Sequence, residues 1–116
     1  MVRYEVTDAD TAVSVGSGDV PVLATPRLIA WMEAATMQVA TQFTGPGQTT
    51  VGTAVRIEHR RATTVGGAVE VVAQAPAAPA GRRLTFGVRA TDDSGQLVAT
   101  GEIDRAIVYR QQFLGH

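Results

Sequence analysis

One carboxylate interrupts the apolar face of the most helix-like segment of this chain. Residues 23–35, LATPRLIAWMEAA, predict a buried helix, and at about 100° per residue Glu33 falls between Ala40 and Met37 on its apolar side. No basic residue stands three or four positions from Glu33, so its partner must come from another element. Burying an ionised carboxylate is costly unless a partner or a reaction uses it. Glu33 is therefore the first candidate for chemistry.

A histidine and an arginine on two predicted strands point in the same direction as the core residues. Strict alternation along residues 50–62 places His59 on the apolar face of its strand and Gly52 on the opposite face. In the last predicted strand, Arg105 is the one charge on the apolar face, so both side chains are candidates to meet Glu33. The residues that share a face with His59 are Val51, Thr53, Val55 and Ile57, and those that share one with Arg105 are Leu97, Ala99, Gly101, Ile103 and Ile107.

A hydroxyl completes the set. Thr25 stands directly before Pro26, which is the pattern of a helix start with a hydroxyl at the N-cap. Each residue has an ordinary structural explanation: Thr25 as the cap, His59 as a hydrogen-bonded core residue, and Arg105 as the neutralising partner of Glu33. A carboxylate, an imidazole and a hydroxyl that converge from a helix, a strand and an entry loop also form a general acid–base site. The combination favours the catalytic explanation.

One long helix and a set of antiparallel strands must position these residues. The helix is expected from Thr25 to about Phe43, where TGPGQ ends it. Residues 2–7 and 11–15 predict a first strand or a broken strand, followed by a loop at 16–21. Four strands are expected after the helix, at 50–62, 68–75, 82–91 and 96–110. This β-α-β-β-β-β order predicts an α+β fold, with one antiparallel sheet wrapped around the helix, as a single domain over residues 1–116.

Composition excludes several kinds of chemistry. Hydrophobic residues make up 45% of the 116 residues and charged residues 18%, which permits a packed core, and the net charge of −1 argues against a nucleic-acid or membrane-surface partner. All ten basic residues are arginine, a bias typical of a GC-rich bacterial gene, so lysine Schiff-base chemistry is excluded. With no cysteine and two histidines we expect no metal site. With no signal peptide and no membrane-spanning run we expect a cytoplasmic protein.

Three stretches carry a resemblance to a known family. The chain resembles the fluoroacetyl-CoA thioesterase-like branch of the hot-dog superfamily in VLATPRLIAWMEAAT, in TVGTAVRIEHRRATTVGGAVEV and in GRRLTFGVRATDDSGQLVATGEIDRAIV, which span nearly the whole chain from about residue 20. The resemblance implies a hot-dog fold, a homodimer or dimer of dimers, and hydrolysis of an acyl thioester of coenzyme A or of a carrier protein. It also implies a catalytic triad of Thr25, Glu33 and His59, close approach of the acyl group to the backbone at Gly52, and a place for Arg105 near the acyl pocket.

Two features depart from the family pattern. The family commonly has Gly-x-His-x-Arg in the last strand, whereas GEIDR here places Ile103 and Asp104 before Arg105. The fluoroacetate-specific enzyme has aromatic lid residues in a longer N-terminal region, and the segment SVGSGDVPV contains no aromatic residue. Selectivity for a fluorinated acyl group is therefore not predicted.

The expected function is thioester hydrolysis without a cofactor, because a thioester is already activated and coenzyme A is part of the substrate. Glu33 would act as general base on water or as a carboxylate nucleophile, and His59 would orient or protonate. A backbone N–H near the helix start or at Gly52 would hold the oxyanion. Guanidinium groups pair well with phosphates, and the candidates to bind the nucleotide end of coenzyme A are Arg60, Arg61, Arg82 and Arg83.

Three alternatives stay open. A hot-dog dehydratase or hydratase would use the same pocket on an acyl thioester with a different acid–base pair. A non-catalytic acyl-CoA binding module would bind the ester without releasing thiol. A cone-shaped fold of the polyketide-cyclase kind is a weaker alternative, since such folds usually carry more helix than one central element.

Overall fold

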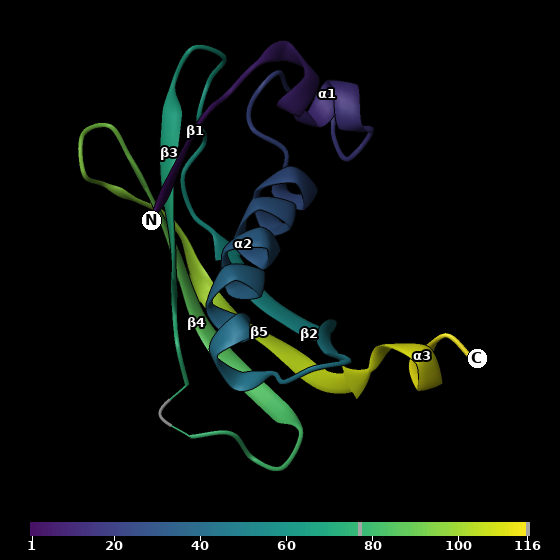
Figure 1. The fold of residues 1–116 in the computed structure, drawn as a ribbon. Coiled ribbons are helices and arrows are strands. Elements are labelled where there is room, and N and C mark those ends of the chain that lie inside the picture. The colour runs from purple at the N-terminus through teal and green to yellow at the C-terminus, as the bar shows by residue number, and fades with distance from the viewer. Residues whose placement is uncertain (77, 116) are drawn as a thin grey trace.

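A curved antiparallel sheet wraps around one long helix in the computed structural model, which describes residues 1–76 and 78–115 (Figure 1). Within those residues the sheet has five strands in the spatial order β1-β3-β4-β5-β2. The strands are β1 (Val2–Glu5), β2 (Gln48–His59), β3 (Ala68–Gln74), β4 (Arg83–Asp92) and β5 (Leu97–Tyr109). The helical elements are η1 (Asp8–Asp10), α1 (Ala12–Val15), α2 (Thr25–Ala40), η2 (Thr41–Phe43) and α3 (Arg110–Phe113). The predicted α+β hot-dog architecture is confirmed.

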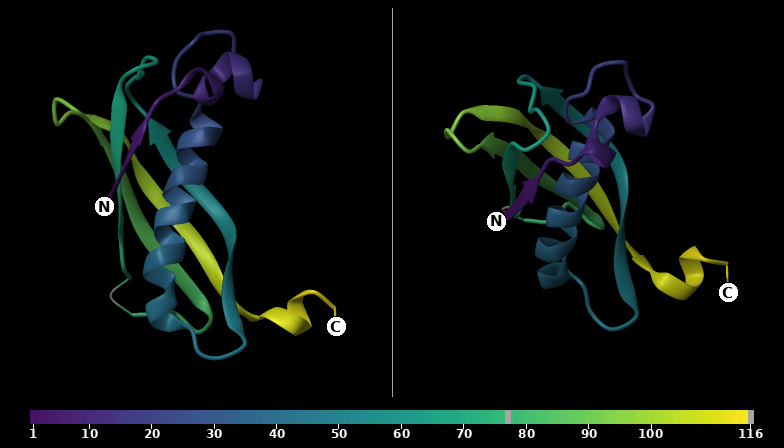
Figure 2. Two further views of the ribbon diagram at one scale, coloured as in Figure 1. Left: turned by 45° about the horizontal axis from the view of Figure 1, so that its top comes forward. Right: turned by 90° about the horizontal axis from the view of Figure 1, so that it is seen from above.

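Helix α2 lies across one face of the sheet and leaves the other face uncovered (Figure 2). Its buried side chains recur at helical spacing and pack on the inward residues of the sheet, so that removal of apolar surface from water holds the two layers together. The buried residues of α2 are Leu28, Met32, Ala35, Thr36 and Ala40. The α-helix ends at Ala40, and a 3-10 turn continues it to Phe43, close to the predicted end.

The segment 11–15 is helical, and the prediction of a strand there is wrong. The Thr7 N–H donates to the Asp10 carboxylate at 2.9 Å, and the Ser14 N–H donates to the Thr11 hydroxyl at 3.3 Å. Gly16 then ends α1 in the left-handed region, with φ of 87°. These local side-chain bonds satisfy the free N–H groups of two short helical turns, and so they outweigh the β propensity of Val13 and Val15.

A bulge in β2 makes the prediction of strict alternation wrong for its first half. Gly52 pairs with Arg105 and Ala54 with Asp104, so Thr53 is an extra residue with no partner of its own on β5. The extra residue shifts the parity of the strand. Gly52 therefore faces α2 together with His59, although they were predicted on opposite faces. Val51 and Thr53 do not share the face of His59.

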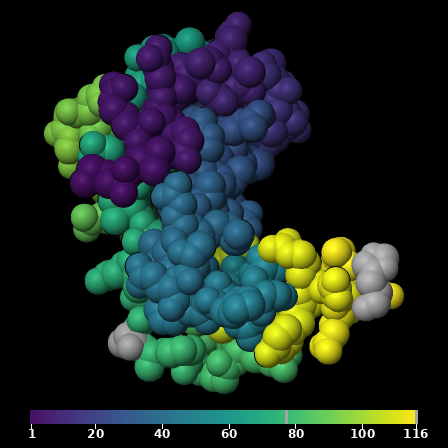
Figure 3. Space-filling view, in the orientation of Figure 1, coloured from purple at the N-terminus to yellow at the C-terminus, as the bar shows by residue number. Residues whose placement is uncertain are grey.

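Strand β2 and the C-terminal segment form one flank of the molecule. Among the described strands, β2 is the last in the sheet and pairs only with β5. Helix α3, which was not predicted, follows β5 and stands out from the body, and the surface is hollowed between it and the N-terminal segment (Figure 3). In the part of the chain that the structure describes, no helix has the length and apolar character needed to cross a membrane.

Candidate active site

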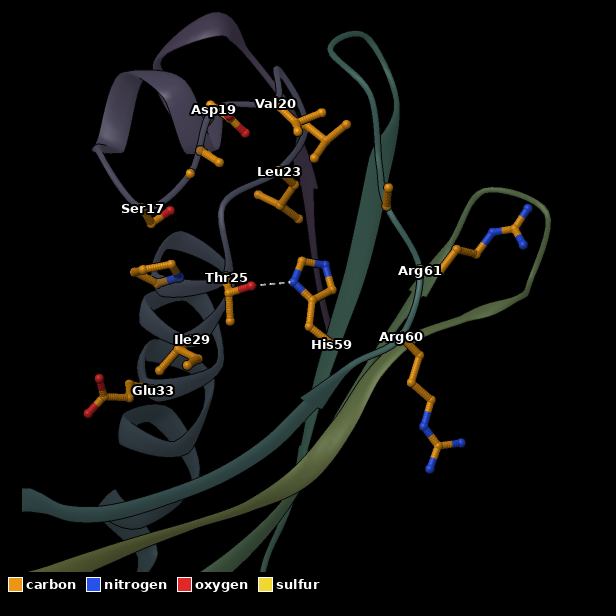
Figure 4. A pocket seen from close by; sticks show the side chains of 15 residues that line it. Ser17, Asp19, Val20, Leu23, Thr25, Ile29, Glu33, His59, Arg60 and Arg61 are labelled. Carbon is orange, nitrogen blue, oxygen red and sulfur yellow. Dashed lines mark hydrogen bonds between the residues drawn. The ribbon is translucent and has the colours of Figure 1, made fainter.

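A cavity of about 820 Å³ opens between the first half of α2, the end of β2 and the loop that joins α1 to α2 (Figure 4). We call it the site cavity. Thr25, Glu33 and His59, predicted from the sequence as one group, all line it. The bridges of Thr11 with Leu23 and of Val22 with Thr64 fix the end of the covering loop. The remaining wall is mostly aliphatic or small and consists of Ala12, Ser17, Gly18, Asp19, Val20, Val22, Leu23, Pro26, Ile29, Arg60, Arg61 and Ala62.

Thr25 and His59 form a direct hydrogen bond. The Thr25 hydroxyl lies 2.7 Å from Nδ1 of His59, and the two side chains face each other across the cavity wall (Figure 4). Thr25 is not the N-cap that the sequence predicted. The Leu28 N–H donates to the carbonyl of Ala24 at 3.0 Å, so Ala24 is the cap and Thr25 is the first helical residue. The hydroxyl is thereby free to bond across to β2.

The His59 ring is partly withdrawn from water. Burial lowers the pKa of His59 below its usual value, and the backbone of Arg61 offsets part of that effect by favouring the charged ring. Nε2 is buried and has no hydrogen-bond partner among the described residues. A lowered pKa keeps the imidazole neutral near pH 7, and a neutral imidazole can accept a proton from a hydroxyl or from water.

Glu33 is paired with Arg105 rather than with the histidine. Its Oε2 lies 3.7 Å from Nη1 of Arg105, and its side chain is 39% exposed, so it is less buried than the helical wheel predicted. Within residues 1–76 and 78–115 no hydrogen bond joins Glu33 to Thr25 or His59, and its carboxylate points away from them (Figure 4). The site therefore consists of two pairs: a hydroxyl with an imidazole, which both line the cavity, and a carboxylate on the cavity with a guanidinium behind it.

Gly52 and Arg105 lie behind Glu33 and do not line the site cavity. A Cβ added to Gly52 would come within 2.6 Å of Oε2 of Glu33, so the carboxylate lies against the glycine backbone. Arg105 is 6% exposed, and burial lowers its pKa while the charge of Glu33 raises it. Both residues thus contact the candidate catalytic carboxylate, and their place beside the acyl group stays a prediction of the resemblance.

The four candidate phosphate-binding arginines divide into two groups. Arg60 pairs with Glu58 at 2.7 Å and Arg61 with Asp92 at 3.1 Å; both line the site cavity, and their guanidinium groups extend outward (Figure 4). Arg82 and Arg83 lie elsewhere. Arg83 pairs with Ala106 and His59 with Ala99, which places these arginines about 23 Å away along the sheet.

The two residues that depart from the family motif have different surroundings. Ile103 is fully buried in the core under α2. Asp104 faces the other side of the sheet, where Arg56 and Thr85 donate to its carboxylate at 2.9 and 2.8 Å and lower its pKa. Neither lines the site cavity. Among the described residues no group of three or more carboxylate, histidine or cysteine side chains is placed to hold a metal ion.

Comparison with known proteins adds sequence and structural relatives. Residues 6–111 match the family model described as fluoroacetyl-CoA-specific thioesterase. The chain is 32% identical over 92 residues to the fluoroacetyl-CoA thioesterase of Streptantibioticus cattleyicolor, a match that covers 79% of this chain and 65% of that protein's length.

The solved structures agree in fold. A structure of the fluoroacetyl-CoA thioesterase FlK superposes with a TM-score of 0.87 at 27% identity, covering 98% of this chain and 87% of that one. A mutant of the same enzyme in complex with fluoroacetate and CoA gives 0.86 at 26%, covering 98% and 92%. A hypothetical protein of Thermus thermophilus, a thioesterase superfamily member, gives 0.89 at 24% identity, covering 98% and 83%, and shows the fold alone.

Proposed function

The chain belongs to the fluoroacetyl-CoA-specific thioesterase family, and on that premise we propose that it hydrolyses a small acyl thioester of coenzyme A or of a carrier protein. The observation that carries the proposal is the 2.7 Å contact between the Thr25 hydroxyl and His59 on the wall of a cavity that Glu33 also lines. A hydroxyl, a neutral imidazole and a carboxylate supply the groups that acyl transfer to water requires.

The proposed reaction follows one of two routes from Glu33. As general base, Glu33 takes a proton from water as the water oxygen attacks the thioester carbonyl carbon; the C–S bond breaks and the thiolate takes up that proton. As nucleophile, Glu33 displaces the thiolate itself; water then hydrolyses the acyl–Glu33 anhydride and gives its proton through Thr25 to neutral His59, and the charged ring returns that proton to the thiolate. Rapid quenching followed by intact-mass measurement separates the routes, because only the second adds the mass of the acyl group to the chain.

The helix geometry suits a substrate that spans both pairs. Thr25 and Glu33 are eight residues apart on α2, about 12 Å along the axis. The thioester group would lie between them; in the general-base route Nδ1–H of His59 would donate to the Thr25 hydroxyl, which in turn donates to the developing oxyanion. The backbone N–H at Gly52 and those of the first turn of α2 are further candidate oxyanion donors. No step of this mechanism calls for a cofactor.

The acyl group is the part of the proposal that differs from the named relatives. No residue lining the described cavity is Phe, Tyr or Trp, and the covering loop contributes Gly18 and Val20. An aliphatic wall offers no aromatic contact to recognise a carbon–fluorine bond. We propose hydrolysis of small aliphatic acyl groups without selectivity for fluoroacetyl.

A homodimer, or a dimer of dimers, is part of the proposal. Strand β2 has 12 residues, and its outer edge carries no partner among the described strands, so its backbone groups can pair with a second copy. Two apolar side chains beside that edge, Val55 and Met37, are 41% and 39% exposed. The Glu33 carboxylate lies against Gly52 of the same strand, so the candidate site is close to this edge. Sedimentation should give about twice the chain mass of 12.2 kDa, or about four times, and a species at 12.2 kDa alone would count against assembly.

A cytoplasmic location is also proposed, in keeping with a chain that has no cysteine for disulfides.

A thiol-release assay tests the activity against the alternatives. Purified protein is incubated with a panel of acyl-CoA esters and, separately, with an enoyl-CoA. Release of free thiol from the acyl esters supports the thioesterase. Loss of the enoyl double bond without thiol release would instead identify a hydratase. Binding of the intact ester by the protein, with neither reaction, would identify a binding module.

A further inference from the structure

The guanidinium that holds Glu33 is itself held by one threonine. Nε of Arg105 donates to the Thr50 hydroxyl at 2.8 Å, and Nη2 donates to the Thr50 carbonyl at 3.0 Å and contacts the Met37 sulfur at 2.9 Å. The remaining nitrogen, Nη1, lies 3.7 Å from the Glu33 carboxylate. Thr50 therefore occupies two of the three guanidinium nitrogens and leaves the third directed at Glu33.

Burial makes these contacts matter. Thr50 is 5% exposed and Arg105 is 6% exposed, so water does not replace a lost partner there. A buried guanidinium with an unsatisfied N–H is costly and turns toward another acceptor. The hydroxyl of Thr50 thus accepts a hydrogen bond that the buried guanidinium would otherwise lack, and it also fixes the plane of the guanidinium.

The β2 bulge is what brings Thr50 to this place. Thr50 lies on the near side of the bulge, two residues before Gly52, and therefore faces α2 with the glycine. Oε2 of Glu33 then lies against both the Gly52 backbone and Nη1 of Arg105, which are cross-strand neighbours on β2 and β5. A carboxylate with two fixed neighbours has few rotamers left, which is the preorganisation that a base or nucleophile needs.

We propose that Thr50 is a positioning residue of the active site, which fixes Arg105 and, through it, the Glu33 carboxylate. The inference rests on the proposed catalytic role of Glu33. Thr50 does not line the site cavity, so its effect should fall on kcat and leave KM for the ester nearly unchanged.

The test compares Thr50→Val, which removes the hydroxyl at nearly constant shape, with Thr50→Ser, which keeps it. We expect T50V to lower kcat roughly 10- to 100-fold, the scale of a displaced catalytic group, and T50S to stay within about threefold of the parent. Thr50→Ala, which also lacks the hydroxyl, replaces T50V if that variant does not fold. Thr49→Val is the matched control, because Thr49 is the neighbouring threonine on the same strand and does not contact Arg105.

A double-mutant cycle with Glu33→Gln decides whether Thr50 acts through Glu33. If it does, T50V lowers kcat in the parent and changes nothing further in E33Q. An equal loss in both backgrounds, or parent-like kcat in T50V, would overturn the proposal. Full activity of E33Q alone would instead overturn the proposed role of Glu33, so the two failures are distinguishable.

Discussion

The Thr25 hydroxyl bonds to His59 Nδ1 at 2.7 Å because Thr25 is the first residue of α2 and not its cap. A capping hydroxyl would turn back to the N–H groups of its own helix. One position further along, the same hydroxyl reaches across to the end of β2. The structural explanation that competed with the catalytic one for Thr25 is thereby removed.

Substitutions of Thr25 should affect activity more than stability. Thr25→Ala removes an exposed hydroxyl that caps nothing, and alanine is the better helix former, so we expect a change below about 1 kcal/mol in the free energy of unfolding. The rate should fall at least about tenfold, since the hydroxyl that faces the reacting carbonyl is lost. Thr25→Ser keeps the hydroxyl and should stay within about threefold. Thermal denaturation and kcat measured on the same preparations check this, and a T25A enzyme as fast as the parent would leave the hydroxyl without a role.

Glu33→Gln should preserve the fold and abolish most hydrolysis. The amide keeps the shape of the side chain and its contact with Gly52, but it can neither attack a carbonyl nor take a proton from water. We expect a loss of roughly 10²- to 10⁴-fold in kcat. Arg105→Lys is a useful companion, since it keeps the charge near Glu33 and cannot make both bonds to Thr50. An intermediate rate would show how much the fixed geometry contributes, whereas parent-like hydrolysis by E33Q would make Glu33 a structural ion-pair partner.

The long elements and the site residues on them could be predicted from sequence because their signals are local. The apolar spacing of Leu28, Met32 and Ala35 predicts α2, and the turn residues around 65–67 and 92–95 separate β2 to β5 near their observed ends. Alternation along the second half of β2 also places His59 toward α2 correctly. Helix α1 is hard to predict from sequence because Val13 and Val15 are β-branched and favour a strand, whereas its helix signals are confined to its ends at Thr11 and Gly16.

What could not be predicted depends on one inserted residue. The bulge at Thr53 has no residue signature of its own, and it reverses the facing of Thr50 and Gly52 while leaving His59 unchanged. Without the bulge, Gly52 could not lie against Glu33 and Thr50 could not reach Arg105. The 39% exposure of the Glu33 side chain could not be predicted either, because a helical wheel gives the direction of a side chain but not where the sheet beneath it ends.

Two double variants compare the candidate phosphate-binding arginines. Arg60→Glu with Arg61→Glu reverses charge at the cavity, whereas Arg82→Glu with Arg83→Glu makes the same change about 23 Å along the sheet. We expect the first pair to raise KM for coenzyme A esters several-fold, more strongly at low salt, and to leave KM for a short N-acetylcysteamine thioester unchanged. The second pair should leave both constants unchanged. Equal effects of the two double variants would indicate that net charge, rather than position, governs binding of the nucleotide end.

The pH dependence of hydrolysis tests the neutral form of His59. Burial lowers the pKa of His59 below its ordinary value of 6.5. The ring therefore stays neutral as the pH is lowered from 8 to 7, and it gains its proton only below pH 6.5. If neutral His59 holds the Thr25 hydroxyl and accepts the proton of water, kcat should be level above pH 6.5 and fall as the ring becomes charged. His59→Ala should lower kcat by roughly a hundredfold or more and remove this limb, so that the residual rate no longer responds to pH in that range. His59→Asn, which can still bond to Thr25 but does not titrate, should remove the limb with a smaller loss of rate. The free energy of unfolding should also fall on acidification. The unfolded chain takes up this proton at higher pH than the native ring does, so stability present above pH 6.5 is lost as the pH falls through the native pKa. His59→Ala should lose less stability over the same pH range. A pH profile of His59→Ala that superimposes on that of the parent, at a similar rate, would make the histidine a core residue and would leave Glu33 and Arg105 as the pair that carries the chemistry.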